Sequence, residues 1–223
     1  MILPPARRRV CGAGPRLPWS RRGRAPARAR RTNASGASLV GSILVLTVLA
    51  TVAAFATPSV LNLRSSVAIR SAAGEVGIAF FRARSLAISS GRNVGLKFRR
   101  NGDRWEWTVY ADGNGNGVRT ADITRGIDRP VGAFGWTRND VMPGILGASV
   151  PDPGQPSSYL VNPSDPIRFN SSDICSFSPV GESTPGSVYL WDGHDRMAVV
   201  RVFGRSAKLR TLYYRRGDAD WKP

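Results

Sequence analysis

The sequence predicts an α+β fold, in which a long N-terminal helix with a membrane half and an amphipathic half packs on antiparallel β-sheets. Residues 32–63 carry no charged side chain, and small and apolar residues then recur at helical spacing as far as Gly91. Beyond Gly91 the chain breaks into short alternating runs separated by turn residues, which is typical of antiparallel strands. The predicted parts are a basic segment at 1–36, a transmembrane helix at 37–57, an amphipathic helix at 58–91 and a β-rich head at 92–223.

The positive charge is concentrated at the two ends of the chain. The protein has 223 residues and a net charge of +17. Residues 1–36 hold ten arginines and no acidic residue, residues 196–223 hold eight basic and two acidic residues, and the stretch between them is nearly neutral. This distribution argues against a nucleic-acid-binding domain with basic side chains spread over its whole surface.

Residues 37–57 form an apolar run of the length that crosses a bilayer, about 30 Å at 1.5 Å per residue. The arginines before it predict that the N-terminal segment stays in the cytoplasm and that the head lies outside. Two alternatives remain. One is a buried core helix, which the length and uniformity of the run disfavour. The other is a cleaved signal peptide, for which residues 54–56 (Ala-Phe-Ala) offer a small-residue site.

The helix is expected to continue to Ser90, because no turn signal follows Pro58 until Gly91. One face carries small and apolar residues at spacings of three and four, namely Ala68, Ala72, Val76, Ala79, Phe80, Ala83, Leu86 and Ala87. The other face carries Arg64, Arg70, Glu75, Arg82 and Arg84. Pro58 is expected to kink the helix, as membrane helices tolerate proline.

The head is predicted to be built from short strands. Alternating runs at 93–99 and 105–111 flank Asn101-Gly102, which is a strong hairpin signal. Residues 113–164 are predicted to be mostly loop, with a short strand near 131–136. Further strands are expected at 167–169, 174–178, 187–191, 197–203 and 207–214.

The N-terminal segment and the helix resemble the type IV pilin superfamily. Residues 35–40 (Ser-Gly-Ala-Ser-Leu-Val) look like a prepilin peptidase site at the end of a basic leader. The resemblance implies cleavage between Gly36 and Ala37 and methylation of the new N-terminal residue, Ala37. Pro58 is then residue 22 of the mature chain, where pilins and pseudopilins usually carry their kinking proline.

Two later blocks resemble the minor pseudopilin H and FimT-like family. They lie at 75–92, where the helix ends, and at 177–205, where Phe-Ser-Pro-Val-Gly-Glu is followed by two strand-like runs and Gly-Arg. The resemblance implies a minor pseudopilin of a type II secretion pseudopilus that takes part in protein export. The alternative is a minor type IV pilus subunit. The implied location is the bacterial inner membrane, with a periplasmic head, and then the pseudopilus.

The resemblance also implies partners: other major and minor pseudopilins, prepilin peptidase, the inner-membrane secretion platform and exported cargo. One departure from the family bears on assembly. The fifth mature residue is Gly41, where the family usually has a glutamate thought to pair with the N-terminal amine of a neighbouring subunit. Its absence is better suited to a minor or terminal subunit than to a shaft subunit.

The segment at 112–117, Asp-Gly-Asn-Gly-Asn-Gly, matches the first half of a calcium-binding loop. The predicted oxygen ligands are the side chains of Asp112, Asn114, Asn116 and Asp122 and the carbonyl of Val118. The twelfth position, where a bidentate glutamate is expected, holds Ile123. The alternative is an ordinary Asn/Gly turn between strands. Calcium is the one cofactor that the sequence suggests.

No enzymatic site is predicted. The single histidine, His194, lies in a polar stretch that reads as a hairpin turn, and no nucleophile elbow accompanies it. Two lone cysteines, Cys11 and Cys175, supply neither a disulfide framework nor a zinc ligand set, and Cys175 is expected to be a buried small apolar residue.

The basic C-terminal region suggests DNA as a further partner. Arg205, Lys208 and Arg210 are the candidate phosphate-binding residues, and Tyr213, Tyr214 and Trp221 are the aromatic residues among the basic ones. Cations with interleaved aromatics can hold a nucleic-acid strand without reading its sequence. The alternative is that these bases form a solvated strand face.

Overall fold

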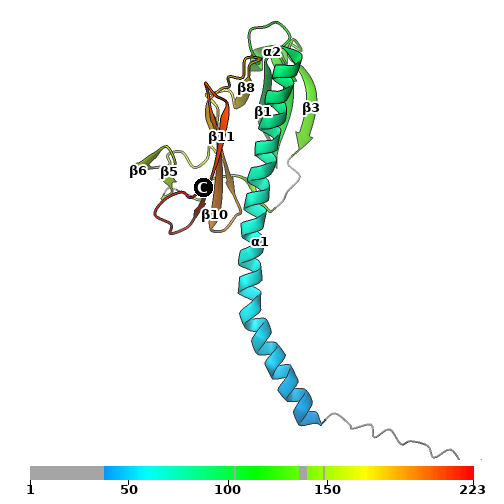
Figure 1. The fold of residues 1–223 in the computed structure, drawn as a ribbon, viewed down its shortest axis with the longest axis vertical. Helices are drawn as coiled ribbons and strands as arrows, with labels where there is room; N and C mark the ends of the chain where they lie inside the picture. The colour runs from blue at the N-terminus through cyan, green and yellow to red at the C-terminus, as the bar shows by residue number, and fades with distance from the viewer. Residues whose placement is uncertain (1–37, 103, 136–139, 148) are drawn as a thin grey trace, which may run out of the picture. The chain divides into compact units, whose positions relative to one another are not determined.

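A computed structural model describes residues 38–102, 104–135, 140–147 and 149–223. The chain divides into two units, Met1–Thr47 and Val48–Pro223, which are described separately. In the first unit, the described part is Ser38 and the first nine residues of a helix, all of them exposed. The second unit holds the rest of that helix and the whole β-rich head (Figure 1).

The helix α1 is a single element of 52 residues, Leu39–Ser90. Its apolar first half has a mean hydropathy of 2.4 over 18 residues with no side chain buried, so α1 is long and apolar enough to cross a membrane. Pro58 lies inside α1, and the kink expected at this residue stays a prediction. The helix ends at Ser90, and the next residue, Gly91, has a φ of 66°, in the left-handed region that commonly follows the last turn of a helix.

The second half of α1 packs on the head through one face, as its periodicity predicts. The buried residues of this face are Ala68, Ile69, Ala72, Ala73, Val76, Phe80, Ala83 and Ala87. Ala79 is partly buried against the same core, whereas Leu86 is exposed. Small side chains dominate the buried face, so the helix backbone can approach the sheets closely.

The first sheet has four antiparallel strands in the order β3-β2-β1-β8. They are β1 (Val94–Asn101), β2 (Arg104–Ala111), β3 (Arg129–Gly135) and β8 (Ile174–Phe177). Asn101 pairs with Arg104, so β1 and β2 form a hairpin with a two-residue turn at the predicted place. The strand expected near 131–136 is confirmed as β3.

The second sheet has the strand order β11-β10-β9-β4, and β7 also pairs with β9. Its strands are β9 (Gly186–Trp191), β10 (Arg196–Phe203), β11 (Lys208–Arg215), β4 (Met142–Pro143) and β7 (Ile167–Arg168). The strands predicted at 167–169, 174–178, 187–191, 197–203 and 207–214 are all confirmed, within one residue at every end. The stretch 113–164 contains more structure than expected: besides β3 and β4 it forms α2 (Thr120–Thr124), β5 (Pro151–Asp152) and β6 (Gln155–Tyr159).

Two hydrophobic clusters hold the head together. The larger lies between α1 and the two sheets, whose strands lie beside the second half of the helix in Figure 1. Phe80 of α1 stands at its centre, with its ring centroid 5.8 Å from that of Phe169 and 6.2 Å from those of Phe98 and Phe177. The smaller cluster covers the opposite face of the second sheet and joins the segment 145–160 to Trp221 near the C-terminal end of the sequence.

Candidate functional site

The Asp112 carboxylate organises the loop that follows β2. It is 3% exposed. Its Oδ1 accepts hydrogen bonds from the backbone N–H groups of Asn114 and Gly115 at 3.0 and 2.8 Å, and its Oδ2 accepts from Gly117 N at 2.7 Å and Asn93 Nδ2 at 2.8 Å. Burial alone would raise the pKa of Asp112, but these donors favour the charged form and lower the pKa overall.

The other predicted calcium ligands lie in or next to the same loop, and each makes different contacts. Asn116 Nδ2 donates to Asp122 Oδ2 at 3.1 Å. The Val118 side chain is buried, and its Cβ lies 2.9 Å from the position a Cβ would take on Gly95. Asp128, which sequence reasoning missed, accepts from Gly113 N at 3.1 Å and Arg119 N at 3.0 Å. Asp112, Asp122 and Asp128 are thus all buried in this loop.

These carboxylates are engaged by N–H donors that shape the turn. Within the described ranges, no group of three or more His, Cys, Asp or Glu side chains is placed to hold a metal ion. The contacts described here are those of a hydrogen-bonded turn, and calcium binding stays a prediction for this loop.

The candidate DNA-binding residues lie at the tip and on the strands of the β10–β11 hairpin. Arg205 is in the turn, Lys208 begins β11, and Arg210 pairs directly with Arg201 of β10. Arg205, Lys208 and Arg210 are exposed. Ion pairs in the described region involve other basic residues: Arg215 and Arg196 pair with Asp195, and Lys222 pairs with Asp218.

The aromatic part of the DNA-binding prediction is wrong for two of its three residues. Tyr214 and Trp221 are 6% and 7% exposed, in the smaller hydrophobic cluster. The Trp221 indole Nε1 donates to the Pro151 carbonyl at 2.7 Å. Tyr213 points to the opposite face of the sheet, where the Arg70 guanidinium lies 4.7 Å from its ring centroid. Strand alternation therefore turns these aromatics into packing residues, because both faces of the sheet are covered.

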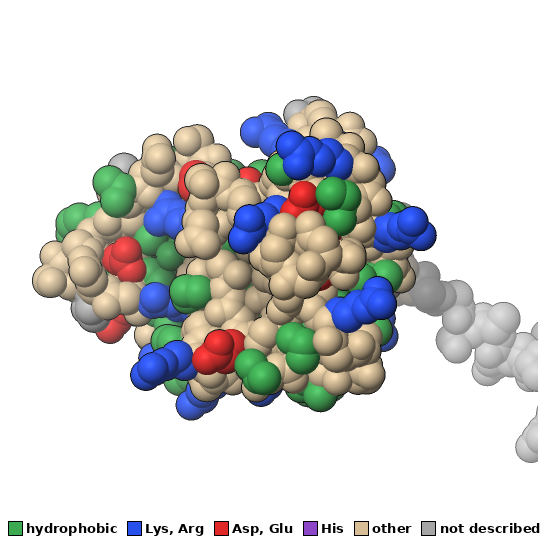
Figure 2. All heavy atoms as spheres, turned by 90° about the horizontal axis from the view of Figure 1, so that it is seen from above, with side chains coloured by type: hydrophobic (Ala, Val, Ile, Leu, Met, Phe, Trp, Pro, Cys, Tyr) green, Lys and Arg blue, Asp and Glu red, His purple; other side chains and the backbone are tan. Residues whose placement is uncertain are grey.

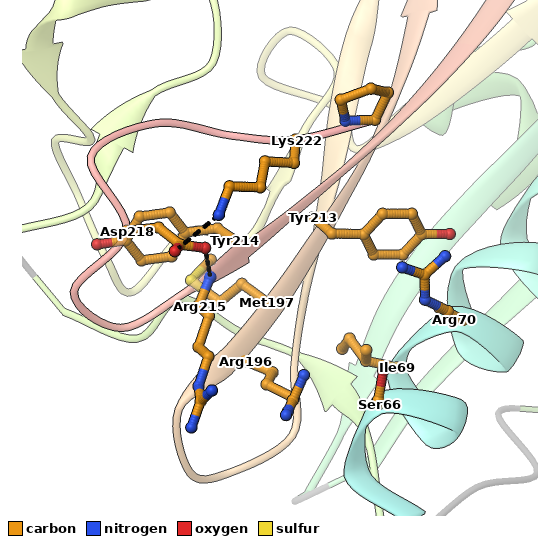
Figure 3. Close-up of a pocket in the computed structure, with 11 residues that line it drawn as sticks. Ser66, Ile69, Arg70, Arg196, Met197, Tyr213, Tyr214, Arg215, Asp218 and Lys222 are labelled. Carbon is orange, nitrogen blue, oxygen red and sulfur yellow. Dashed lines mark hydrogen bonds and ion pairs between the residues drawn. The ribbon is translucent and has the colours of Figure 1, made fainter. Parts of the chain in front are cut away.

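Sequence reasoning also missed a cleft between α1 and the hairpin, with a volume of about 270 Å³. Ser66, Ile69 and Arg70 of α1 line one side, and Arg196, Tyr213 and Arg215 line the other (Figure 3). Asp218 and Lys222 from the C-terminal segment close the rim, paired at 2.9 Å. The basic residues of this cleft are far apart in the sequence, so no local motif indicates it.

A second, larger cavity of about 610 Å³ lies between residues 61–68 of α1 and the turn that joins β9 to β10. His194 is exposed in that turn, as predicted. Its backbone N–H donates to Asp192 Oδ1 at 2.8 Å.

Cys175 is fully buried, which raises the pKa of its thiol well above the usual value and confirms the small apolar role predicted for it.

The residues of the predicted cleavage site, Gly36 and Ala37, lie outside the described residues. Gly41 lies in the first turn of α1 with no other atom within 4 Å of the position that a Cβ would take, so the backbone there is open to a neighbour. Comparisons of the chain with models of protein families, with curated proteins and with solved structures find no match.

Proposed function

We propose that the protein is a minor pseudopilin, a structural subunit of a type II secretion pseudopilus that takes part in protein export. The observation that supports the proposal is the difference between the two halves of α1. The first half is apolar and exposed, and the second half packs in the core of a β-rich head. A subunit that is stored in a membrane and then assembled through its helix needs both halves on one continuous element.

In this proposal the apolar half of α1 holds the subunit in the inner membrane and later packs among the helices of other subunits. Gly41, Ser42 and Ala50 are exposed small residues that permit close approach of a neighbouring helix. Because residue 41 is glycine, the helix offers no carboxylate at this position to neutralise the N-terminal amine of a neighbouring subunit. Because an unpaired charge in hydrocarbon is costly, we place the subunit at a filament end, in few copies.

Replacement of Gly36 by Ile tests the cleavage that this function requires. The Gly36→Ile chain should remain at full length in cells that hold the peptidase, whereas the unmutated chain should lose its first 36 residues. Gly23→Ile, in the same basic segment but outside the motif, is the matched control. Gel mobility and mass of the N-terminal peptide give the readout, and processing of Gly36→Ile at the normal rate would refute the proposal.

The second candidate function is that of a minor type IV pilus subunit whose hairpin binds DNA. One observation favours it: Arg205, Lys208 and Arg210 are exposed and have no ion-pair partner in the described part of the chain, unlike Arg215 and Lys222. The end of the head in Figure 2 gives no further support, because basic side chains lie there in separate places rather than in one patch.

A mobility shift of the full chain in detergent tests this second function. Binding should fall steeply between about 50 and 200 mM salt, because phosphate contacts release counterions. The triple variant Arg205→Ala, Lys208→Ala, Arg210→Ala should lose it. A matched variant, Arg99→Ala, Arg100→Ala, Arg104→Ala, removes the same charge from the β1–β2 hairpin. Equal losses from both variants would mean that charge alone attracts the DNA.

A further inference from the structure

Three arginines from three different elements line the cleft between α1 and the hairpin. Arg70 comes from α1, Arg196 begins β10, and Arg215 ends β11. Arg196 and Arg215 are direct cross-strand partners. Two like charges placed opposite each other destabilise a strand pair unless something compensates them, so this arrangement needs an anion.

Asp195 supplies only part of the negative charge that this pair of arginines requires. Asp195 Oδ2 lies 2.9 Å from Arg215 Nε, which is a good ion pair. Its Oδ1 lies 3.8 Å from Arg196 Nε, too far for a hydrogen bond. Arg196 Nε is shielded from solvent and has no hydrogen-bond partner among the described residues. A buried donor left without an acceptor costs free energy. The Arg196 side chain is 18% exposed, so a ligand in the cleft can contact its guanidinium and recover part of that cost if the side chain turns Nε towards it.

The side chains around the cleft carry a net charge of +2. Arg70, Arg196 and Arg215 line the cleft, and Asp195, which lies beside it, pairs with Arg215, while Lys222 and Asp218 neutralise each other at 2.9 Å. A doubly charged oxyanion matches this excess, whereas one carboxylate would leave half of it. Guanidinium groups also match the planar pairs of oxygens that phosphate presents. The Ser66 hydroxyl adds a neutral donor on the α1 side of the cleft (Figure 3).

The size and place of the cleft limit what carries the anion. A volume of about 270 Å³ suits a small hydrated group better than a drug-sized ligand, for which pockets usually begin at about 300 Å³. The uncharged stretch of the sequence ends at Leu63, and Ser66 and Arg70 follow it by about 4.5 and 10.5 Å along the helix axis, at 1.5 Å per residue. The polar layer of a bilayer is about 5 to 8 Å thick. A lipid phosphate therefore reaches Ser66 if the hydrocarbon extends to Leu63, whereas a hydrocarbon layer that ends at Thr57 leaves the cleft to a soluble phosphate compound.

We propose that this cleft binds a phosphate monoester, carried either by a lipid headgroup or by a soluble phosphate compound. The cleft lies within the folded head, so the proposal holds whether or not the chain serves a secretion pseudopilus. Arg70 and Arg196 hold the phosphate oxygens from the two sides, and Asp195 keeps Arg215 in place. Tyr213 supports the Arg70 guanidinium through its ring, 4.7 Å away.

Calorimetric titration of the full chain with inorganic phosphate, in a maltoside detergent that contains no phosphate, tests the proposal. We expect saturable binding of phosphate and none of acetate at equal ionic strength. Arg70→Gln should weaken phosphate binding about tenfold or more, because it removes a charged donor. The phosphate affinity of Arg70→Lys should lie between those of the unmutated chain and Arg70→Gln, since lysine keeps the charge and loses the planar guanidinium. Arg82→Gln is the matched control, an exposed arginine on the same helix outside the cleft.

Absence of phosphate binding by the unmutated chain would overturn the proposal, and so would equal weakening by Arg82→Gln or equal binding of acetate. Thermal unfolding of each variant confirms that it is folded before titration. The source of the phosphate follows from the same titration in nanodiscs. Phosphatidic acid in the disc should compete with soluble phosphate if the lipid is the ligand. Discs of equal surface charge made with phosphatidylserine, whose phosphate is a diester, should then compete less; equal affinities in both discs assign the cleft to a soluble compound.

Discussion

The Ser65 hydroxyl donates a hydrogen bond to Oδ2 of Asp192, and this bond ties α1 to the turn between β9 and β10. The other oxygen of the same carboxylate accepts from His194 N at 2.8 Å and Arg196 N at 3.1 Å. Asp192 is 9% exposed. One buried carboxylate therefore closes the turn and docks it on the helix, next to the cleft that Arg196 lines.

Ser65→Ala should lower the free energy of unfolding by about 1–2 kcal/mol, because the Asp192 carboxylate then loses a donor in a buried position. Asp192→Ala should cost more, since the turn loses its two backbone contacts as well. Urea unfolding of the full chain in detergent, followed by near-ultraviolet circular dichroism, measures both. Ser85→Ala, at an exposed serine of the same helix, should change little; a similar loss there would show that helix propensity dominates.

Phe80→Ala should destabilise the head by about 3–5 kcal/mol, the range for removing a buried aromatic ring. The ring lies among Phe98, Phe169 and Phe177, so the cavity would open at the junction of α1 with both sheets. The next residue offers a control, because Phe81 is 65% exposed. Phe81→Ala should stay within about 0.5 kcal/mol of the unmutated chain. Equal costs for the two variants in the same denaturation assay would contradict the placement of Phe80.

Asp112→Asn should reduce stability at pH 7 by about 1–3 kcal/mol, since charge-assisted hydrogen bonds are replaced by neutral ones. Because the folded-state pKa of Asp112 is lowered, its carboxylate stabilises the fold above the unfolded value of about 3.9, and this stabilisation is lost as the pH falls through the folded pKa. The difference between variant and unmutated chain should therefore shrink below about pH 4. Asp165→Asn, at an exposed carboxylate, should show no such convergence. A difference for Asp112→Asn that is constant with pH would contradict this role.

Calcium should raise the melting temperature of the full chain if the Asp112 loop binds it. The paired variant Asp112→Ala, Asn114→Ala should then abolish the shift, because it removes two of the predicted oxygen ligands. Since this pair also removes turn contacts, Asn114→Ala alone gives a milder comparison. The measurement is thermal unfolding with calcium and with chelator, and magnesium serves as the ionic control. No calcium-dependent shift in the unmutated chain would leave the segment as a turn.

The elements that the sequence predicts well are those with a long or strict period. The buried face of α1 and the five strands after residue 166 follow from apolar spacing alone. The strands missed within 113–164 are short: β4 and β5 have two residues each, and β6 has five. A two-residue strand such as β4 has no period to detect, and its partner is distant in sequence, since Met142 pairs with Trp191.

The cleft was harder to predict than these elements, because it depends on which face of a strand each side chain occupies and on what packs against that face. The neighbouring residues Tyr213 and Tyr214 lie on opposite faces of β11, and only the structure shows that the Tyr214 face is covered by residues 145–160. In the same way, Arg70 meets Arg196 and Arg215 only after the hairpin docks on α1. The motif at 112–117, by contrast, is visible in the sequence and drew attention to Asp112 and Asp122, although the burial of these carboxylates and the part played by Asp128 are not.

The two cross-strand arginine pairs also bear on the order of folding. Arg196 opposes Arg215 and Arg201 opposes Arg210, so the β10–β11 hairpin repels itself when it forms alone. Asp195 compensates one pair, and contact with α1 and β9 must supply the rest of the stabilisation. The hairpin should therefore close late, after its docking surface exists, and added salt should speed that step by screening the repulsion. The net positive charge of the head is concentrated in the β10–β11 hairpin, and ionic strength should therefore control the rate at which this hairpin assembles.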